Sequence, residues 1–535
     1  MTHVLFSGGR VLTSGSPFPV EASILICCGT ILGVGDRREI KGRAPAGAEE
    51  VDLGGGLVVP GLVDSHVHLL GLGLRLIGDR LDLTSTRSLA ETLVVIREHA
   101  SALPAGEPIR GGGWDANVWP ERRRPTAAHL EAVAPGRPVA LTSKCGHSAW
   151  VSGEILRAAG IAAETPDPPG GRIGRDASGQ PDGMLYEAAM EAVWALRPEV
   201  SVPRRKEALL AAQRHAHGLG LVGCHNCEGP ETLGPLLELQ SEGLLRLRVT
   251  HHIPEHLVAQ AAELAMGSRL GGEWLRIGSL KVFADGSLGA RTAAMLEPYH
   301  GTADTGLLEH DADSIAELGR KAAQARLGLA AHAIGDRAVR ELLDGLQALA
   351  DEGLTPPIPH RVEHAQHVHE DDVPRLARLG VIASVQPVHL RGDRAMVAAH
   401  LPGREGRAFA YGSVLRAGAT LCFGSDAPVE TMDPLQGLRA AVMRRDWDEE
   451  PADGWRPEER LSVIDALAGY SRGPGLASGT AAVEGAIAPG YRADFSVLTH
   501  DIVTEPDALP ECRVTATVVG GEVVHTTSPS GRGRR

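Results

Sequence analysis

This chain of 535 residues has few aromatic residues, and its sequence shows neither clustered positive charge nor a disulfide pattern. Aromatic side chains make up 3% of the sequence, whereas there are 66 glycines and 35 prolines, so small aliphatic residues must form the core and turns must be numerous. A net charge of −14 argues against a nucleic-acid-binding surface. Seven cysteines scattered over so long a chain do not form a disulfide framework.

A long uninterrupted apolar run is also missing. The stretch 57–77 is rich in aliphatic residues and glycine, but Asp64, His66 and His68 make its middle too polar to span a bilayer. The first ten residues, MTHVLFSGGR, lack the charged and apolar regions of a signal peptide. We therefore expect a cytoplasmic protein without a membrane partner.

Two kinds of local pattern divide the chain. Short β-rich segments separated by glycine fill residues 1–61 and return in 481–535, so both termini should build one small β-sandwich that ends in a disordered tail. Residues 62–480 alternate short apolar strands with helical stretches, which predicts an α/β fold with a parallel sheet. About eight such units predict a (β/α)8 TIM barrel. We expect inserted loops around 110–120 and 165–183, the second being a functional loop or a small hairpin.

Chemically competent side chains follow the predicted barrel strands. His66 and His68 end the first strand, where residues two apart point to the same side and can share one metal ion. The other candidates at strand ends are Lys281, His332, His364 and Asp426. Each has an ordinary structural explanation by itself, such as a core histidine or a helix cap. Together they predict an active site at the carboxyl ends of the strands.

These residues lie in motifs that resemble the amidohydrolase superfamily, and within it the YtcJ-like branch, or amidohydrolase family 3, to which N-substituted formamide deformylases belong. The matching segments include PGLVDSHVHLLG, GGGWDANVWP, GSLKVFADGSLGARTA, AHAIGDRAV, HRVEHAQ and GSDAPVE, and they cover almost the whole length. The resemblance implies a distorted (β/α)8 barrel and one or two divalent metal ions, zinc or a similar ion.

The resemblance also implies a role for each candidate. His66 and His68 would hold the first ion, His332 and His364 the second, and Asp426 would touch the first ion and the attacking water. Lys281 matches the position that carries a bridging carbamate, formed from carbon dioxide, in related binuclear enzymes. This modification needs a lysine with a lowered pKa. The alternative is a single ion with an unmodified Lys281.

The reaction implied is hydrolysis of carbon–nitrogen bonds other than peptide bonds, with small amides such as N-substituted formamides as the leading substrates. A metal-bound water attacks the carbonyl carbon, and Asp426 acts as general base and then general acid. Trp114, His147 and His389 are predicted to contact the substrate, although Trp114 could instead only pack a loop. Deamination or cyclic-amide opening would use the same site, whereas a non-catalytic scaffold would lack these ligands. The expected partner is a small-molecule substrate. The sequence leaves open whether the protein forms a homo-oligomer.

Overall fold

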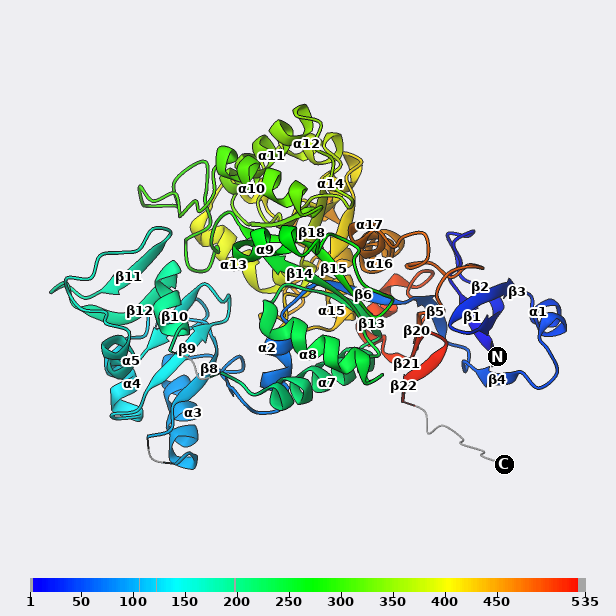
Figure 1. Ribbon diagram of the computed structural model, residues 1–535, viewed down its shortest axis with the longest axis horizontal. Helices are drawn as coiled ribbons and strands as arrows, with labels where there is room; N and C mark the ends of the chain where they lie inside the picture. Colours follow the sequence, from blue (N-terminus) through cyan, green and yellow to red (C-terminus); the bar gives the residue numbers. More distant parts are fainter. Residues whose placement is uncertain (1–2, 105, 122, 197–198, 528–535) are drawn as a thin grey trace.

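Eight parallel strands form the centre of the computed structural model, which describes residues 3–104, 106–121, 123–196 and 199–527 (Figure 1). Each strand pairs with the next along the barrel, and a backbone bridge between Val67 and Ala427 joins the first strand to the segment after the last. The predicted barrel is confirmed. Its strands are β6 (Leu62–Val67), β13 (Leu221–Asn226), β14 (Arg248–Pro254), β15 (Leu275–Phe283), β16 (Leu329–Ala333), β17 (Arg361–His364), β18 (Ile382–Val385) and β19 (Leu421–Phe423).

Helices connect these strands and cover the outside of the barrel, as parallel pairing requires (Figure 1). In α11, the buried Val339, Leu342 and Leu346 recur every three or four residues, which gives the helix one apolar side. The helices of this part are α2 (Leu69–Leu76), α7 (Val202–Gly218), α8 (Pro230–Ser241), α9 (Val258–Glu263), α10 (Ala312–Gln324), α11 (Asp336–Asp351), α12 (Val373–Arg378), α13 (Leu390–His400), α14 (Tyr411–Arg416), α15 (Pro434–Met443), α16 (Val463–Tyr470) and α17 (Arg472–Ser478).

Both ends of the chain contribute to the small β-sandwich domain, as predicted. Strand β5 pairs antiparallel with β20, so segments more than 400 residues apart share one sheet. Inside it, the rings of Phe6 and Phe495 meet edge to face with their centres 5.1 Å apart. The exact domain boundaries stay a prediction. The elements are β1 (His3–Val11), β2 (Val20–Cys27), β3 (Thr30–Gly35), α1 (Arg37–Arg43), β4 (Glu49–Asp52), β5 (Leu57–Pro60), β20 (Phe495–Leu498), β21 (Val514–Val519) and β22 (Glu522–Thr526).

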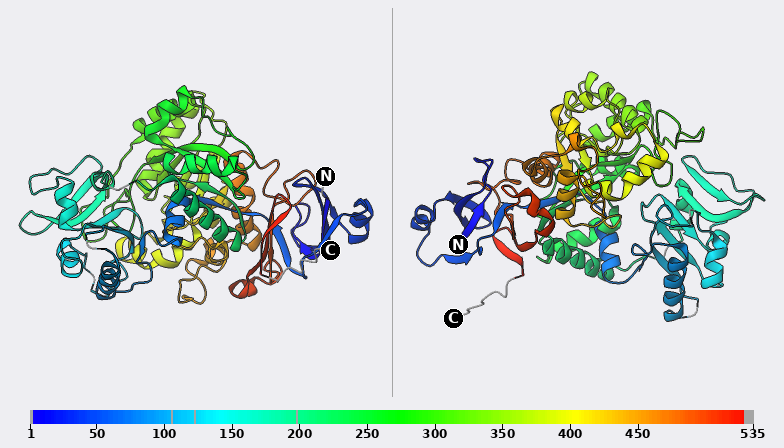
Figure 2. Two further views of the ribbon diagram at one scale, coloured as in Figure 1. Left: turned by 60° about the horizontal axis from the view of Figure 1, so that its bottom comes forward. Right: turned by 180° about the vertical axis from the view of Figure 1, so that it is seen from behind.

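A third, six-stranded sheet is inserted between β6 and β13. It has apolar cores of its own, and Figures 1 and 2 place it on the opposite side of the barrel from the β-sandwich domain. The segments predicted as loops, 110–120 and 165–183, contain parts of its strands; the second is a hairpin of β11 and β12. The elements are β7 (Leu81–Asp82), α3 (Leu89–Ala102), β8 (Ile109–Trp114), α4 (Ala127–Val133), β9 (Val139–Ser143), β10 (Ser148–Val151), α5 (Gly153–Ala158), β11 (Gly171–Arg175), β12 (Pro181–Glu187) and α6 (Glu191–Trp194).

Glycine explains why β8 has the sequence pattern of a loop. Consecutive glycines are depleted in ordinary strands. Here the neighbouring backbones leave no room for a side chain: a Cβ would lie 2.1 Å from the Leu81 oxygen at Gly111 and 2.3 Å from the Thr142 oxygen at Gly112. The glycines therefore allow β7, β8 and β9 to approach one another closely.

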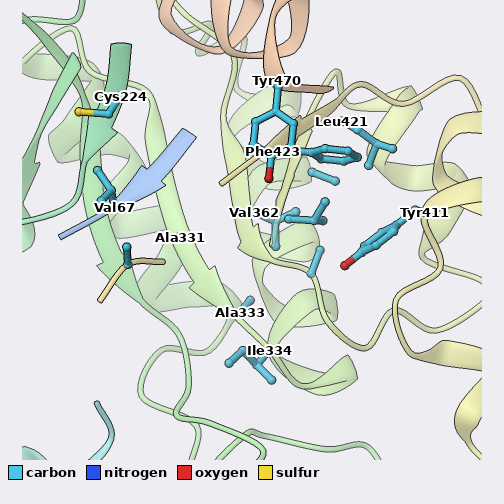
Figure 3. Close-up of a cluster of buried hydrophobic side chains, with 14 of the residues drawn as sticks. Val67, Cys224, Ala331, Ala333, Ile334, Val362, Tyr411, Leu421, Phe423 and Tyr470 are labelled. Atoms are coloured by element: carbon cyan, nitrogen blue, oxygen red, sulfur yellow. The ribbon is translucent and has the colours of Figure 1, made fainter. Parts of the chain in front are cut away.

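The barrel wall separates polar from apolar side chains. Figure 3 shows Val67, Ala331 and Ala333 among the buried apolar residues, and these are the chain neighbours of His66, His68 and His332. Strand alternation thus directs the histidines away from this apolar cluster. Across the described parts of the chain, every helix is too short or too polar to cross a membrane.

Candidate metal centre

Two histidines and a carboxylate converge where β6 and β19 end. His66 Nε2 and His68 Nε2 lie 3.6 and 3.1 Å from the same oxygen, Oδ1 of Asp426. Two ligand atoms bound to one tetrahedral zinc-like ion at ~2.1 Å are about 3.4 Å apart, so these separations bracket the required value. We call His66, His68 and Asp426 the first trio.

Backbone hydrogen bonds fix the first trio in place. The Asp426 amide donates to the His66 carbonyl at 2.7 Å, and the His68 amide donates to the Ala427 carbonyl at 2.8 Å. Asp64 reinforces the same junction, since its carboxylate accepts hydrogen bonds from the amide and hydroxyl of Ser425. The two ends of the barrel sheet are thus joined at the site itself.

A second trio consists of His364, His389 and Asp426, so both trios share one carboxylate. His389 Nε2 is 4.0 Å from Asp426 Oδ2, the oxygen that faces away from the first trio's closest contacts. His332 lies beside the second trio, with its ring centre 4.5 Å from that of His364. His332 Nε2 is 3.0 Å from the Gly286 carbonyl, which can only accept, so Nδ1 keeps its lone pair for a ligand.

The protonation states of these groups suit a cation. Burial lowers the pKa of His66, His332 and His364, which keeps their imidazoles neutral near pH 7. Burial alone would raise the pKa of Asp426, but its hydrogen bond with His68 and the nearby imidazoles hold it below its usual range. Burial opposes protonation of His68, but its hydrogen bond with Asp426 raises its pKa, so an ion at this position would replace a shared proton. Neutral imidazoles and an ionised carboxylate are the donors that a divalent borderline ion prefers. The residues present therefore fit the metal that the resemblance implies.

Glu363 orients His66, a role that sequence reasoning missed. Its Oε2 lies 2.6 Å from His66 Nδ1, so the ring donates there and leaves Nε2 for the first trio. Arg361 holds the other side of this carboxylate through Nε at 2.5 Å, and both residues are completely buried. Strand alternation predicts that Glu363 and His364 point in opposite directions. They do not, because His364 leaves the strand conformation with a φ of +73°.

Replacing Glu363 by glutamine should weaken metal binding about 10- to 100-fold, because the charged acceptor that fixes His66 is lost. Metal affinity, measured by competition with a chelator, tests this. Glu459→Gln is the matched control, since Glu459 is also buried but bonds to Ser413 instead. Equal affinity in a folded Glu363→Gln variant and the wild type would contradict this orienting role.

Lys281 lies on β15 and is buried. The residue is 3% exposed, and its Nζ makes no hydrogen bond with any residue that the structure describes. Its Nζ lies 4.2 Å from the centre of the Phe283 ring. Burial lowers the pKa of Lys281, which favours the neutral amine that reacts with carbon dioxide.

The inserted sheet places His147, one of the residues predicted to contact the substrate, beside His332. His147 follows β9, and the centre of its ring lies 5.0 Å from the centre of the His332 ring. Its Nδ1 lies 2.7 Å from Glu187 Oε2. Burial opposes protonation, but Glu187 raises the pKa of His147 to about 10. Trp114 lies apart, packed against Trp119 and Trp150 with its indole N–H donated to a backbone carbonyl, which favours the packing role left open by the sequence.

Two further side chains, Asn226 and Glu228, cap the helix that follows His68. Helix α2 begins directly after His68, and its first free amides are capped by side chains from the end of β13. Asn226 accepts from Leu69, and Glu228 accepts from Leu70 and Gly71. Since side chains of one strand cap a helix that follows another, no local sequence signal could identify this cap.

An eight-stranded parallel barrel with candidate histidine and carboxylate ligands at the carboxyl ends of its strands is typical of metal-dependent barrel hydrolases. Residues 49–525 match the model of the amidohydrolase family, and the chain belongs to that family. The family resemblance read from the sequence is confirmed.

Three relatives match over nearly the whole chain. The protein LONG AFTER FAR-RED 3 of Arabidopsis thaliana is 34% identical, with 98% of this chain and 92% of the relative covered. The putative amidohydrolase YtcJ of Bacillus subtilis is 32% identical, with 98% and 99% covered. The N-substituted formamide deformylase of Arthrobacter pascens is 29% identical, with 97% and 98% covered.

Two solved structures share the fold at full length. An uncharacterized metal-dependent hydrolase from Pyrococcus horikoshii has a TM-score of 0.76 and 27% identity, covering 98% of this chain and 100% of that one. Another from Pyrococcus furiosus has a TM-score of 0.72 and 29% identity, covering 94% and 100%. Both neighbours agree with a metal-dependent hydrolase.

Proposed function

We propose that this protein hydrolyses carbon–nitrogen bonds other than peptide bonds in small amides, with N-substituted formamides as the leading substrates. The observation that carries the proposal is the first trio, in which two imidazoles approach one carboxylate oxygen of Asp426. The full-length similarity to an N-substituted formamide deformylase supports the choice of formamides.

A bound divalent ion supplies an acidified water and a Lewis acid for the amide oxygen. Asp426 is the proton acceptor, because its carboxylate lies beside both histidines of the first trio. The same carboxyl then returns the proton to the leaving nitrogen. His147, held by Glu187, donates a hydrogen bond to the substrate oxygen. A carbamate formed on Lys281 from carbon dioxide would add two oxygens that share one negative charge to the site.

A substrate screen tests the reaction class. Purified metal-replete protein is given N-substituted formamides, N-acyl amino acids, cyclic amides and aminated heterocycles, and release of amine, acid or ammonia is measured. We expect formate and a free amine from the formamides. Turnover limited to the heterocycles or the cyclic amides would instead identify a deaminase or a cyclic-amide hydrolase, for which the same residues serve. Turnover of none of the four classes would contradict the proposed reaction.

A further inference from the structure

Strand β15, which the structure describes in full, ends at Phe283, its single exposed residue. The eight residues before it are buried, whereas Phe283 is 40% exposed. Isolated exposed aromatic residues are common on protein surfaces and need no special explanation. Phe283 differs from them because the strand, rather than an outer loop, decides where its ring lies.

Strand alternation directs Phe283 toward the inside of the barrel. Side chains two residues apart in a strand share a side, so Phe283 faces the same way as Lys281. The two side chains are in contact, with Lys281 Nζ 4.2 Å from the centre of the ring. Val282, between them, packs on the other side in the buried apolar core. Because Phe283 is the last residue of a parallel barrel strand, its ring lies at the mouth of the barrel.

His332 connects Phe283 with the candidate site. The two residues are partners across β15 and β16, and their ring centres lie 5.4 Å apart with the planes tilted by 33°. The same His332 ring lies 5.0 Å from that of His147, measured between centres. An exposed apolar ring and a hydrogen-bond donor therefore border the same candidate metal ligand.

We propose that Phe283 is a specificity-determining residue whose exposed ring contacts an apolar group of the substrate, preferably an aromatic one. The protein would then select amides that carry such a group over the smallest amides. This proposal rests on the proposed function, because it names the kind of group that the hydrolysed amide carries.

The chemistry of the side chain favours this role. A phenyl ring offers no ligand atom to a metal ion and no group for proton transfer, so Phe283 can contribute only contact area and ring geometry. Packing within the protein leaves 40% of Phe283 in water. Apolar surface in water is unfavourable, and an apolar substrate group that covers the ring recovers this free energy. An aromatic group also gains from a stacked or edge-to-face arrangement of the two rings.

Binding of two hydroxamates tests the proposal. Zinc-loaded protein is titrated in a calorimeter with phenylacetohydroxamate and with acetohydroxamate, which share the metal-binding group and differ by one phenyl ring. Wild-type protein should bind the phenyl compound about 10- to 100-fold more tightly, the range expected for burying an aromatic group. Phe283→Ala should lose most of this preference and still bind acetohydroxamate as tightly as the wild type.

Phe18→Ala is the matched control. Phe18 is 60% exposed, but it lies between β1 and β2 in the β-sandwich domain, so this variant should keep the full preference. Phe283→Gln covers the case in which alanine disturbs folding, since glutamine is a longer side chain that water solvates. It should lose the preference in the same way.

Two outcomes would overturn the proposal. One is a wild type with equal affinity for the two hydroxamates, which includes binding of neither. The other is a folded Phe283→Ala or Phe283→Gln variant that keeps the wild-type ratio of affinities. Because the measurement uses no turnover, failure of the formamide screen leaves this result interpretable, and a preference that depends on Phe283 would then belong to a substrate of another reaction class.

Discussion

Replacing Asp426 by asparagine should lower kcat by about 10²–10⁴-fold, the range that general acid–base catalysis supplies. Asparagine has nearly the same shape and keeps one oxygen to face His68, but its amide cannot accept and return a proton near pH 7. The His66 and His68 nitrogens stay in place because the backbone of residue 426 still donates to the His66 carbonyl. Steady-state kinetics on the substrate identified by the screen provide the measurement.

Metal content and folding distinguish this loss from damage to the site. The first ion should still be bound by Asp426→Asn, and thermal unfolding should stay close to that of the wild type. Asp311→Asn is a suitable control, because Asp311 caps α10 and lies outside the metal centre, and asparagine caps equally well. Activity of Asp426→Asn near the wild-type level would show that another group carries the proton.

Removing the divalent ions should abolish activity, and adding zinc or a similar ion should restore it. Each trio places ligand atoms of two histidines and Asp426 within 4.8 Å of one another, which suits a divalent ion. The folded state should also lose stability, by about 2.7 kcal/mol when the ion had been present at 100 times its Kd. Activity and the unfolding temperature are measured before chelation, after chelation and after reconstitution.

Magnesium, which prefers oxygen ligands, serves as the control ion and should restore less activity than zinc at equal concentration. Full activity in protein whose metal content has fallen far below one ion per chain would contradict a metal-dependent hydrolase. Recovery of the unfolding temperature without recovery of activity would show that the ions are structural.

The sequence is most informative where chemistry and local geometry coincide. His66 and His68 stand two residues apart at the end of a strand, so strand alternation alone predicts that they share a side and that Val67 packs elsewhere. The structure has Val67 fully buried in the apolar core. The barrel can also be predicted from the sequence, because apolar residues recur with the spacing of a strand or a helix in each of its units.

Local rules fail where the backbone leaves its regular conformation. At the end of β17, the φ of +73° at His364 brings that side chain to the same region as Glu363, against the alternation expected for neighbours. The glycines of β8 give the pattern of a loop, although neighbouring strands require them. Trp114 stands in a family motif, yet its ring belongs to the core of the inserted sheet.

The sequence by itself therefore determined the barrel, the two-ended β-sandwich domain, the family and the identity of the candidate ligands, since each follows from residue types and spacings within short segments. The tertiary structure decided which of these side chains meet, how Glu363 and Arg361 orient His66, and that His389 shares Asp426 with His364. The contact between His66 and Glu363 joins residues 297 positions apart. The distances in such contacts depend on how the strands close into a barrel, which no local pattern of residues encodes.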